Sequence, residues 1–74
     1  MDKFITAKEI ATHYHLSYQV TNRYTDAGLL EVAFKKGNKR FYNRSVVGKR
    51  IKQIVNLAQE GYPLGLIRRK LVGI

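Results

Sequence analysis

The stretch Ser17–Asn43, "SYQVTNRYTDAGLLEVAFKKGNKRFYN", carries the strongest structural signals in the chain. Ser17 is a favourable N-cap, so the sequence predicts a helix over about 18–26. Gly28 follows where helices commonly end in a left-handed conformation. The remainder changes from helical spacing to alternating apolar residues around a Gly-Asn turn. The stretch therefore predicts a helix followed by a hairpin.

The predicted hairpin spans about 31–42. Val32 and Phe34 alternate with Glu31, Ala33 and Lys35, and the aromatics at 41–42 favour strands by type. Gly37-Asn38 is a typical turn pair between them. Because so short a hairpin is marginal alone, we expect it to pack on helices.

A first helix is predicted upstream, over about 7–14. Thr6 can cap it, and Glu9 three residues later completes a capping box. Only "HLS" (15–17) separates this helix from the next, which gives a helix-turn-helix pattern.

Two further helices are predicted downstream, over about 46–60 and 64–71. Asn43 or Ser45 can cap the first of them, and Gly61 ends it. Its apolar stripe consists of Val47, Ile51, Ile54 and Ala58. The expected fold is mainly α with a small β-hairpin, in a single domain spanning residues 1–74.

Charge is the most informative feature of the composition. Of 74 residues, 14 are Lys or Arg and five are Asp or Glu, giving a net charge of +9. Such a surface attracts polyanions: nucleic acid, anionic lipid or acidic protein. There is no cysteine to form disulfides or thiolate metal sites. No apolar run approaches the roughly 18 residues of a membrane span, and the N-terminus lacks a signal-peptide pattern, so we expect a cytoplasmic protein.

The polar face of the predicted 18–26 helix offers groups that suit DNA. Tyr18, Gln19, Asn22 and Arg23 fall on this face. Gln and Asn side chains can read adenine edges, and Arg can bind guanine or phosphate. The Tyr24 hydroxyl can bind a phosphate. The alternative for this face is ordinary solvent exposure.

The hairpin turn concentrates positive charge. Lys35, Lys36, Lys39 and Arg40 surround Asn38 and would repel one another unless they met an anion. A wing extending from a helix-turn-helix reaches the DNA backbone or minor groove, where such cations neutralise phosphates. The alternative is a solubilising loop.

The order and spacing of these pieces resemble the DNA-binding domain of the MerR family of bacterial regulators. The matching segments are "TAKEIATHY", "SYQVTNRYTDAGLL", "KRFY" and "IKQIVNLAQEGYPLGLIRRKL", and the resemblance extends over residues 5–71. The pattern is also similar to phage excisionases and to the N-terminal domains of plasmid partition proteins. The resemblance implies a winged helix-turn-helix that binds double-stranded DNA, as a dimer or as a cooperative head-to-tail array.

Individual roles follow from the resemblance only where residues match. It implies a phosphate contact for Tyr24, the wing Arg for Arg40 and the closing wing Tyr for Tyr42. Asn22 stands where the family usually has a phosphate-binding Arg, which leaves Asn22 or Arg23 for that role. The full candidate DNA-binding set is Ser17, Tyr18, Gln19, Asn22, Arg23, Tyr24, Lys35, Lys36, Asn38, Lys39, Arg40 and Tyr42.

Other functions remain as alternatives. Transcriptional regulation and architectural DNA binding, in excision or plasmid partition, would use the same surface. The basic, amphipathic "LIRRKLVGI" (66–74) also fits a membrane-surface or acidic-partner module. Catalysis is not expected, because His13 and His15 face apart and the acids are scattered. No metal or cofactor is expected.

The resemblance also bears on domain organisation. Typical family members continue into a dimerisation helix and an effector domain, whereas this sequence ends at Ile74. Effector sensing is therefore not expected within these residues, and the sequence is compatible with a fragment of a longer protein.

Overall fold

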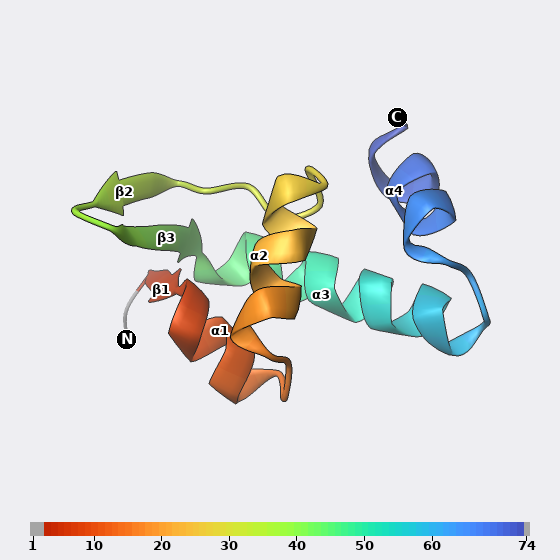
Figure 1. Ribbon diagram of the computed structural model, residues 1–74, viewed down its shortest axis with the longest axis horizontal. Helices are drawn as coiled ribbons and strands as arrows, with labels where there is room; N and C mark the ends of the chain where they lie inside the picture. The colour runs from red at the N-terminus through yellow and green to blue at the C-terminus, as the bar shows by residue number, and fades with distance from the viewer. Residues whose placement is uncertain (1–2, 74) are drawn as a thin grey trace.

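The part of the chain that the structure describes folds into helices and short strands, which Figure 1 draws in order. The computed structural model describes residues 3–73. The helices in that range are α1 (Ala7–His13), α2 (Tyr18–Asp26), α3 (Arg44–Gln59) and α4 (Leu64–Val72). α2 has the predicted bounds, whereas α3 begins two residues before the predicted start at 46. No helix within residues 3–73 is both long and apolar enough to cross a membrane.

Side-chain caps fix three of the helix starts. At α1 the Glu9 amide donates to the Thr6 hydroxyl at 3.2 Å, and the Thr6 amide donates to the Glu9 carboxylate at 2.9 Å. This is the predicted capping box. Ser17 caps α2. Asn43, rather than Ser45, caps α3, because its side-chain oxygen accepts from the Val46 amide at 3.0 Å.

Left-handed residues end α1 and α2. Gly28 has a φ of 82°, and its amide and that of Leu29 donate back to Thr25 and Tyr24 in a Schellman arrangement. His15 ends α1 in the same way with a φ of 58°, although most helices place Gly there. The short α1–α2 turn therefore depends on a strained non-glycine residue.

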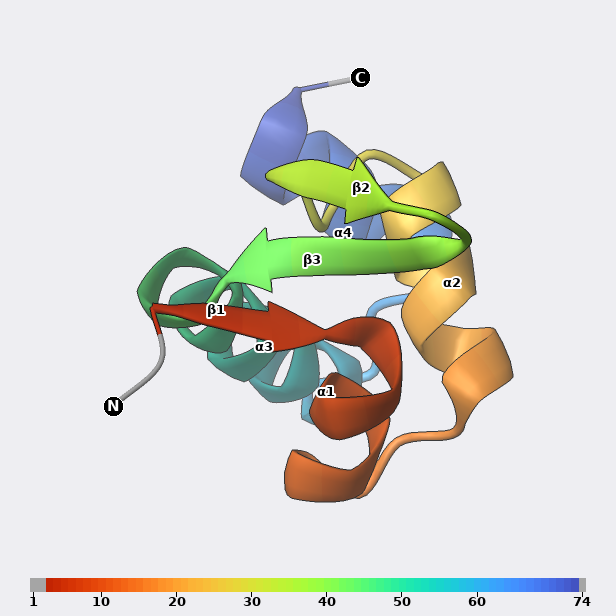
Figure 2. The same cartoon turned by 90° about the vertical axis from the view of Figure 1, so that its left-hand side faces the viewer.

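A third strand extends the predicted hairpin into a sheet. Strands β1 (Phe4–Thr6), β2 (Phe34–Lys36) and β3 (Lys39–Asn43) form an antiparallel sheet with β3 in the centre (Figure 2). The prediction lacked β1 because its pairing partner lies far along the chain. Residues 31–33, expected at the start of the hairpin, form no strand. The described chain is thus an α+β fold of four helices and one small sheet.

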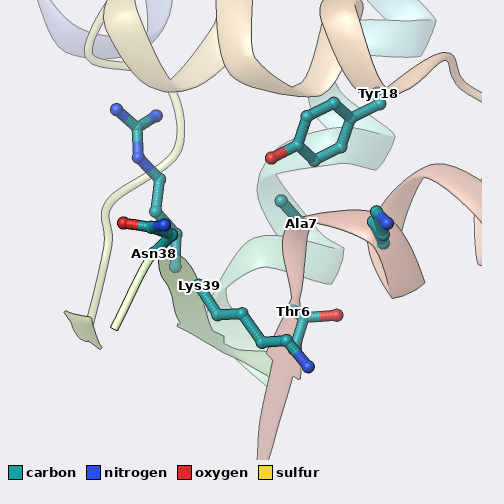
Figure 3. A pocket seen from close by; sticks show the side chains of 7 residues that line it. Thr6, Ala7, Tyr18, Asn38 and Lys39 are labelled. Atoms are coloured by element: carbon teal, nitrogen blue, oxygen red, sulfur yellow. The ribbon is translucent and has the colours of Figure 1, made fainter. Parts of the chain in front are cut away.

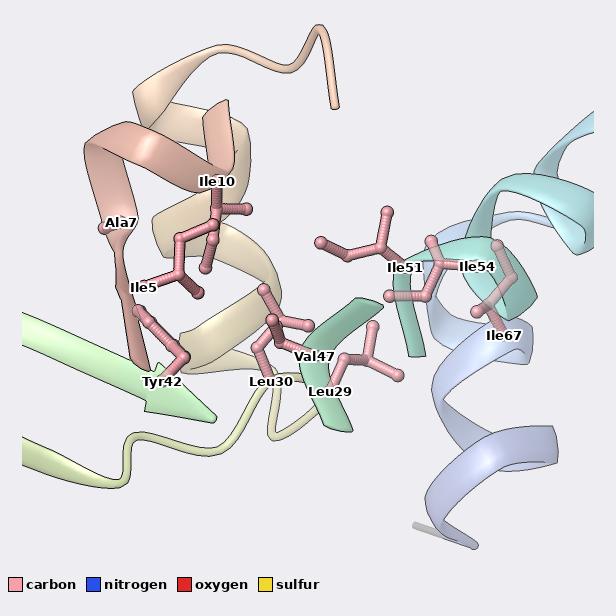
Figure 4. Close-up of a cluster of buried hydrophobic side chains, with 10 residues drawn as sticks. All are labelled: Ile5, Ala7, Ile10, Leu29, Leu30, Tyr42, Val47, Ile51, Ile54 and Ile67. Carbon is pink, nitrogen blue, oxygen red and sulfur yellow. The ribbon is translucent and has the colours of Figure 1, made fainter. Parts of the chain in front are cut away.

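One apolar core joins the sheet to the helices (Figure 4). Its fully buried large side chains include Ile10 from α1, Tyr42 from β3 and Ile51 and Ile54 from α3. Ile67 of α4 closes the core at the end of α3 that lies away from the sheet. Ala58, predicted to belong to the apolar stripe, is exposed because it lies near the C-terminal end of α3, in the helix's last turn.

We expect His15→Gly to raise the free energy of unfolding. A left-handed non-glycine residue costs about 1–2 kcal/mol, of which the greater freedom of glycine in the unfolded chain cancels about half. The expected net gain is about 0.5–1 kcal/mol, measured by urea denaturation.

Gly28→Ala is the matched opposite change. It creates the same strain at the end of α2, where a Cβ would meet no atom within 4 Å. It should therefore destabilise the fold without a clash. A loss of stability in His15→Gly would contradict the assignment of strain to His15.

Candidate nucleic-acid interface

The outward face of α2 presents most of the side chains predicted to contact DNA. Tyr18, Gln19 and Arg23 are exposed, and Asn22 is half-buried beside them. Ser17, just before the helix, uses its hydroxyl to accept from the Val20 amide at 3.0 Å. The structure therefore brings these side chains together on one surface, with Ser17 also serving as the cap.

The inward face of α2 is anchored by threonines that the prediction left out. Thr21 is fully buried, and its hydroxyl donates to the Ser17 carbonyl at 3.1 Å. The Thr25 hydroxyl donates to the Thr21 carbonyl at 3.0 Å and lies 2.8 Å from the Tyr42 hydroxyl. Since Thr25 has one hydroxyl proton, Tyr42 is the donor in that second bond. The sequence did contain a signal for this anchoring, because Thr21 and Thr25 are four residues apart and therefore lie on the same face of the helix.

Tyr42 is therefore not a DNA-contacting residue. Its side chain is 0% exposed, and its hydroxyl is bonded to Thr25. In β3 it lies opposite Ile5 of β1, with both side chains in the core. The inclusion of Tyr42 in the candidate DNA-binding set is contradicted by this burial, because strand alternation turns Tyr42 toward the helices, where it joins β3 to α2. Tyr24 is half-buried against the core, so its phosphate contact stays a prediction.

Strand alternation also divides the four hairpin cations between two faces. Lys35 lies opposite Arg40, and Lys36 lies opposite Lys39. Arg40 shares the face of Tyr42, toward α2, and its guanidinium lies 3.7 Å from the Asp26 carboxylate. Lys36 and Lys39 leave the strands on the opposite, outer face, although the Lys39 side chain also lines a recess between α2 and the hairpin. The hairpin therefore does not direct all four charges toward one ligand.

Two adjoining recesses lie between α2 and the hairpin, and Tyr18, Asn38 and Arg40 line both. One of about 270 Å³ extends toward the start of α1, where Lys8 and Lys39 line it. In Figure 3 the Tyr18 ring and Asn38 stand on opposite sides of its opening. The other, of about 370 Å³, extends along α2 past Asn22. The surface is thus a shallow groove lined by polar and basic groups.

The acidic groups beside this groove are few and partnered. Asp26 faces Arg40, as described above. Hydrogen bonds from the backbone and then the hydroxyl of Thr6 lower the pKa of Glu9, and Arg44 and Lys39 lower it further. Glu9 therefore stays ionised as a cap and does not act as a proton donor near neutral pH.

Two of the three cross-strand pairs in the hairpin are like-charged. Lys35–Arg40 and Lys36–Lys39 each place two cations directly opposite one another, which is destabilising by roughly 0.2–1 kcal/mol per pair. Asp26 offsets part of the first repulsion, although both members of that ion pair are solvent-accessible. An anion bound at the hairpin would relieve the repulsion that remains.

No family model, curated protein or solved structure matches the chain. What this surface can bind is therefore inferred from its own residues and geometry.

We expect Tyr42→Phe to lower the free energy of unfolding by about 0.5–1.5 kcal/mol. The change removes the donor to Thr25 and leaves the core otherwise filled. Tyr62→Phe, in the turn between α3 and α4, is the control for loss of a hydroxyl. Equal denaturation midpoints for Tyr42→Phe and the unaltered protein would show that the bond contributes nothing.

We also expect moderate NaCl to stabilise the free protein, because salt screens the like-charged pairs. Lys36→Gln should raise the free energy of unfolding at low salt by a few tenths of a kcal/mol, because it removes one of the two like-charged pairs. Lys52→Gln, which removes the same charge from the exposed face of α3, is the control. Identical salt dependence in both variants would contradict a repulsion localised at the hairpin.

Proposed function

We propose that the chain is a MerR-like winged helix-turn-helix that binds double-stranded DNA sequence-specifically, as a transcriptional regulator. In this proposal α2 is the recognition helix in the major groove, and the β2–β3 hairpin is the wing on the adjacent backbone or minor groove. One observation supports the proposal. Two like-charged pairs, Lys35–Arg40 and Lys36–Lys39, lie across the two strands of a hairpin that the Tyr42–Thr25 bond joins to α2, whose outward face is polar and exposed.

The proposed DNA-binding side chains fall into two groups, one that contacts bases and one that contacts phosphates. Gln19 and Arg23, both fully available at the surface, are the proposed base readers, together with Tyr18 at the start of α2. Asn22 contributes from inside the groove. Lys35 and Arg40, on the helix side of the hairpin, are the proposed phosphate contacts nearest α2.

Asp26 affects how the Arg40 side chain can meet a phosphate. Its carboxylate lies 3.7 Å from the Arg40 guanidinium, and the two form a solvent-accessible ion pair beside α2. A phosphate must compete with that carboxylate or join it. The proposed consequence is that Asp26 helps to keep the distance between α2 and the hairpin constant. The same carboxylate lowers the affinity of Arg40 for DNA phosphate.

Several copies are proposed to bind together. A single module of this size covers a small DNA interface and binds weakly by itself. Dimers or head-to-tail arrays on DNA would raise affinity through effective concentration. An architectural role in excision or partition would use the same surface and would differ in its target sites.

The test begins with selection of binding sites from random duplexes, followed by titrations of salt. Lys35→Gln combined with Arg40→Gln should weaken binding to selected and random duplexes alike. It should reduce the slope of log K against log salt by about two, one for each phosphate contact. Lys49→Gln combined with Lys52→Gln removes equal charge from α3 and is the control.

Gln19→Ala should have a different effect from the wing variant. It should relax preference at particular base pairs, by about 1–3 kcal/mol if the contact is bidentate. A wing variant whose salt slope equals that of the α3 control, or a selection that yields no motif at any salt, would contradict the proposal.

A further inference from the structure

The face of the sheet that points away from the helices exposes a cluster of aromatic rings. Phe4 of β1, Phe34 of β2 and Phe41 of β3 all lie on this face, opposite in direction to the buried Ile5 and Tyr42. Phe4 is 36% exposed and Phe34 is 42% exposed. This aromatic cluster takes no part in the proposed duplex-binding groove.

The three rings form one continuous contact across all three strands. Phe34 and Phe41 stack with centroids 4.8 Å apart and an interplanar angle of 6°. Phe4 meets Phe34 edge-on, with centroids 5.0 Å apart. Exposed aromatics held in one place lose little freedom when a planar ligand stacks on them, so the cluster suits a flat aromatic partner.

Cations surround the aromatic cluster. Lys36 and Lys39 share its face through the strand register, and the Lys3 ammonium lies 6.0 Å from the centroid of the Phe4 ring. The nearby acid Glu9 is already committed to the α1 cap. The partner must therefore combine flat apolar groups with negative charge.

We propose that this sheet face binds an unpaired DNA strand, with bases stacking on the aromatic cluster and phosphates lying against the lysines. Aromatic side chains combined with a basic surface are the usual platform for single-stranded nucleic acid. A duplex hides the faces of its bases, so it cannot use the rings in this way. A second copy of the chain would bring two positive faces together.

The choice of DNA over RNA rests on the proposed function, because the opposite side of the same hairpin lines the proposed duplex groove. The stacking itself does not depend on that function. The two faces of one hairpin would then hold a duplex and an adjacent unpaired strand.

The test measures anisotropy of a labelled short oligo(dT) and, separately, of a labelled blunt duplex. Phe4→Leu combined with Phe34→Leu keeps apolar bulk on the face and removes two rings. Oligo(dT) affinity should fall about fivefold or more, while duplex affinity stays within a factor of about two. Val46→Ala, which trims an exposed apolar side chain on α3, is the control.

The same titrations separate this proposal from the proposed function. Lys35→Gln combined with Arg40→Gln should weaken duplex binding more than oligo(dT) binding. Unchanged oligo(dT) affinity in the leucine variant would overturn the sheet-face proposal, whatever the duplex result. Tighter binding of oligo(U), displacement of oligo(dT) by an acidic peptide at the rings, or ring-dependent self-association would each also overturn it.

Should the leucine variant unfold, Phe34→Tyr provides a second readout. Tyrosine retains a ring for stacking, so this variant should keep oligo(dT) binding within about twofold of the unaltered protein. A large loss of oligo(dT) binding in a folded Phe34→Tyr variant would count against stacking.

Discussion

The hydrogen bond from Tyr42 to Thr25 sets the relation between the hairpin and α2. It lies between a strand of the sheet and the inward face of the helix, with Tyr42 fully buried. The Thr25 hydroxyl in turn donates to the Thr21 carbonyl, and the Thr21 hydroxyl donates to the Ser17 carbonyl, so the inward face of α2 is bonded from its end to its start. The groove between α2 and the hairpin lies beside this bond, so its shape depends on how the bond places the two elements.

The hairpin is a charged element with two different sides. The side toward α2 carries Lys35 and Arg40, and the outer side carries Lys36 and Lys39 next to the aromatic cluster. A three-residue strand such as β2 gains little from pairing alone, and like charges weaken it further. The Phe34–Phe41 stack and the Tyr42 anchor compensate for these costs. Phosphates of the proposed DNA partner would relieve this charge repulsion.

Local chemistry explains which parts of the fold were predictable. Thr6, Ser17 and Gly28 act through groups a few residues away, so their helix ends could be read directly from the sequence. Strand β1 could not, because three residues carry no measurable periodicity and their partners lie in β3. His15 took the conformation usually reserved for glycine because the α1–α2 turn requires it.

The candidate surface was predictable to a similar degree. The polar spacing on α2 correctly placed Gln19 and Arg23 at the surface. Tyr42 was misjudged because its assignment came from a family resemblance, whereas period-two alternation in the strand puts it with Arg40 on the helix side. The four hairpin cations do not all leave their strands on one face, since alternation separates neighbours along a strand, although the Lys39 side chain also lines the groove beside α2.

The most direct measurement is a ¹⁵N-resolved NMR titration of the chain with a selected duplex. If α2 and the hairpin form one DNA-binding surface, the amides of Tyr18–Arg23 and Lys35–Arg40 will shift together, with one affinity. The amides of α4, whose basic end holds Arg69 and Lys70, will stay in place. Shifts confined to α4, or none in α2, would contradict a recognition role for this surface.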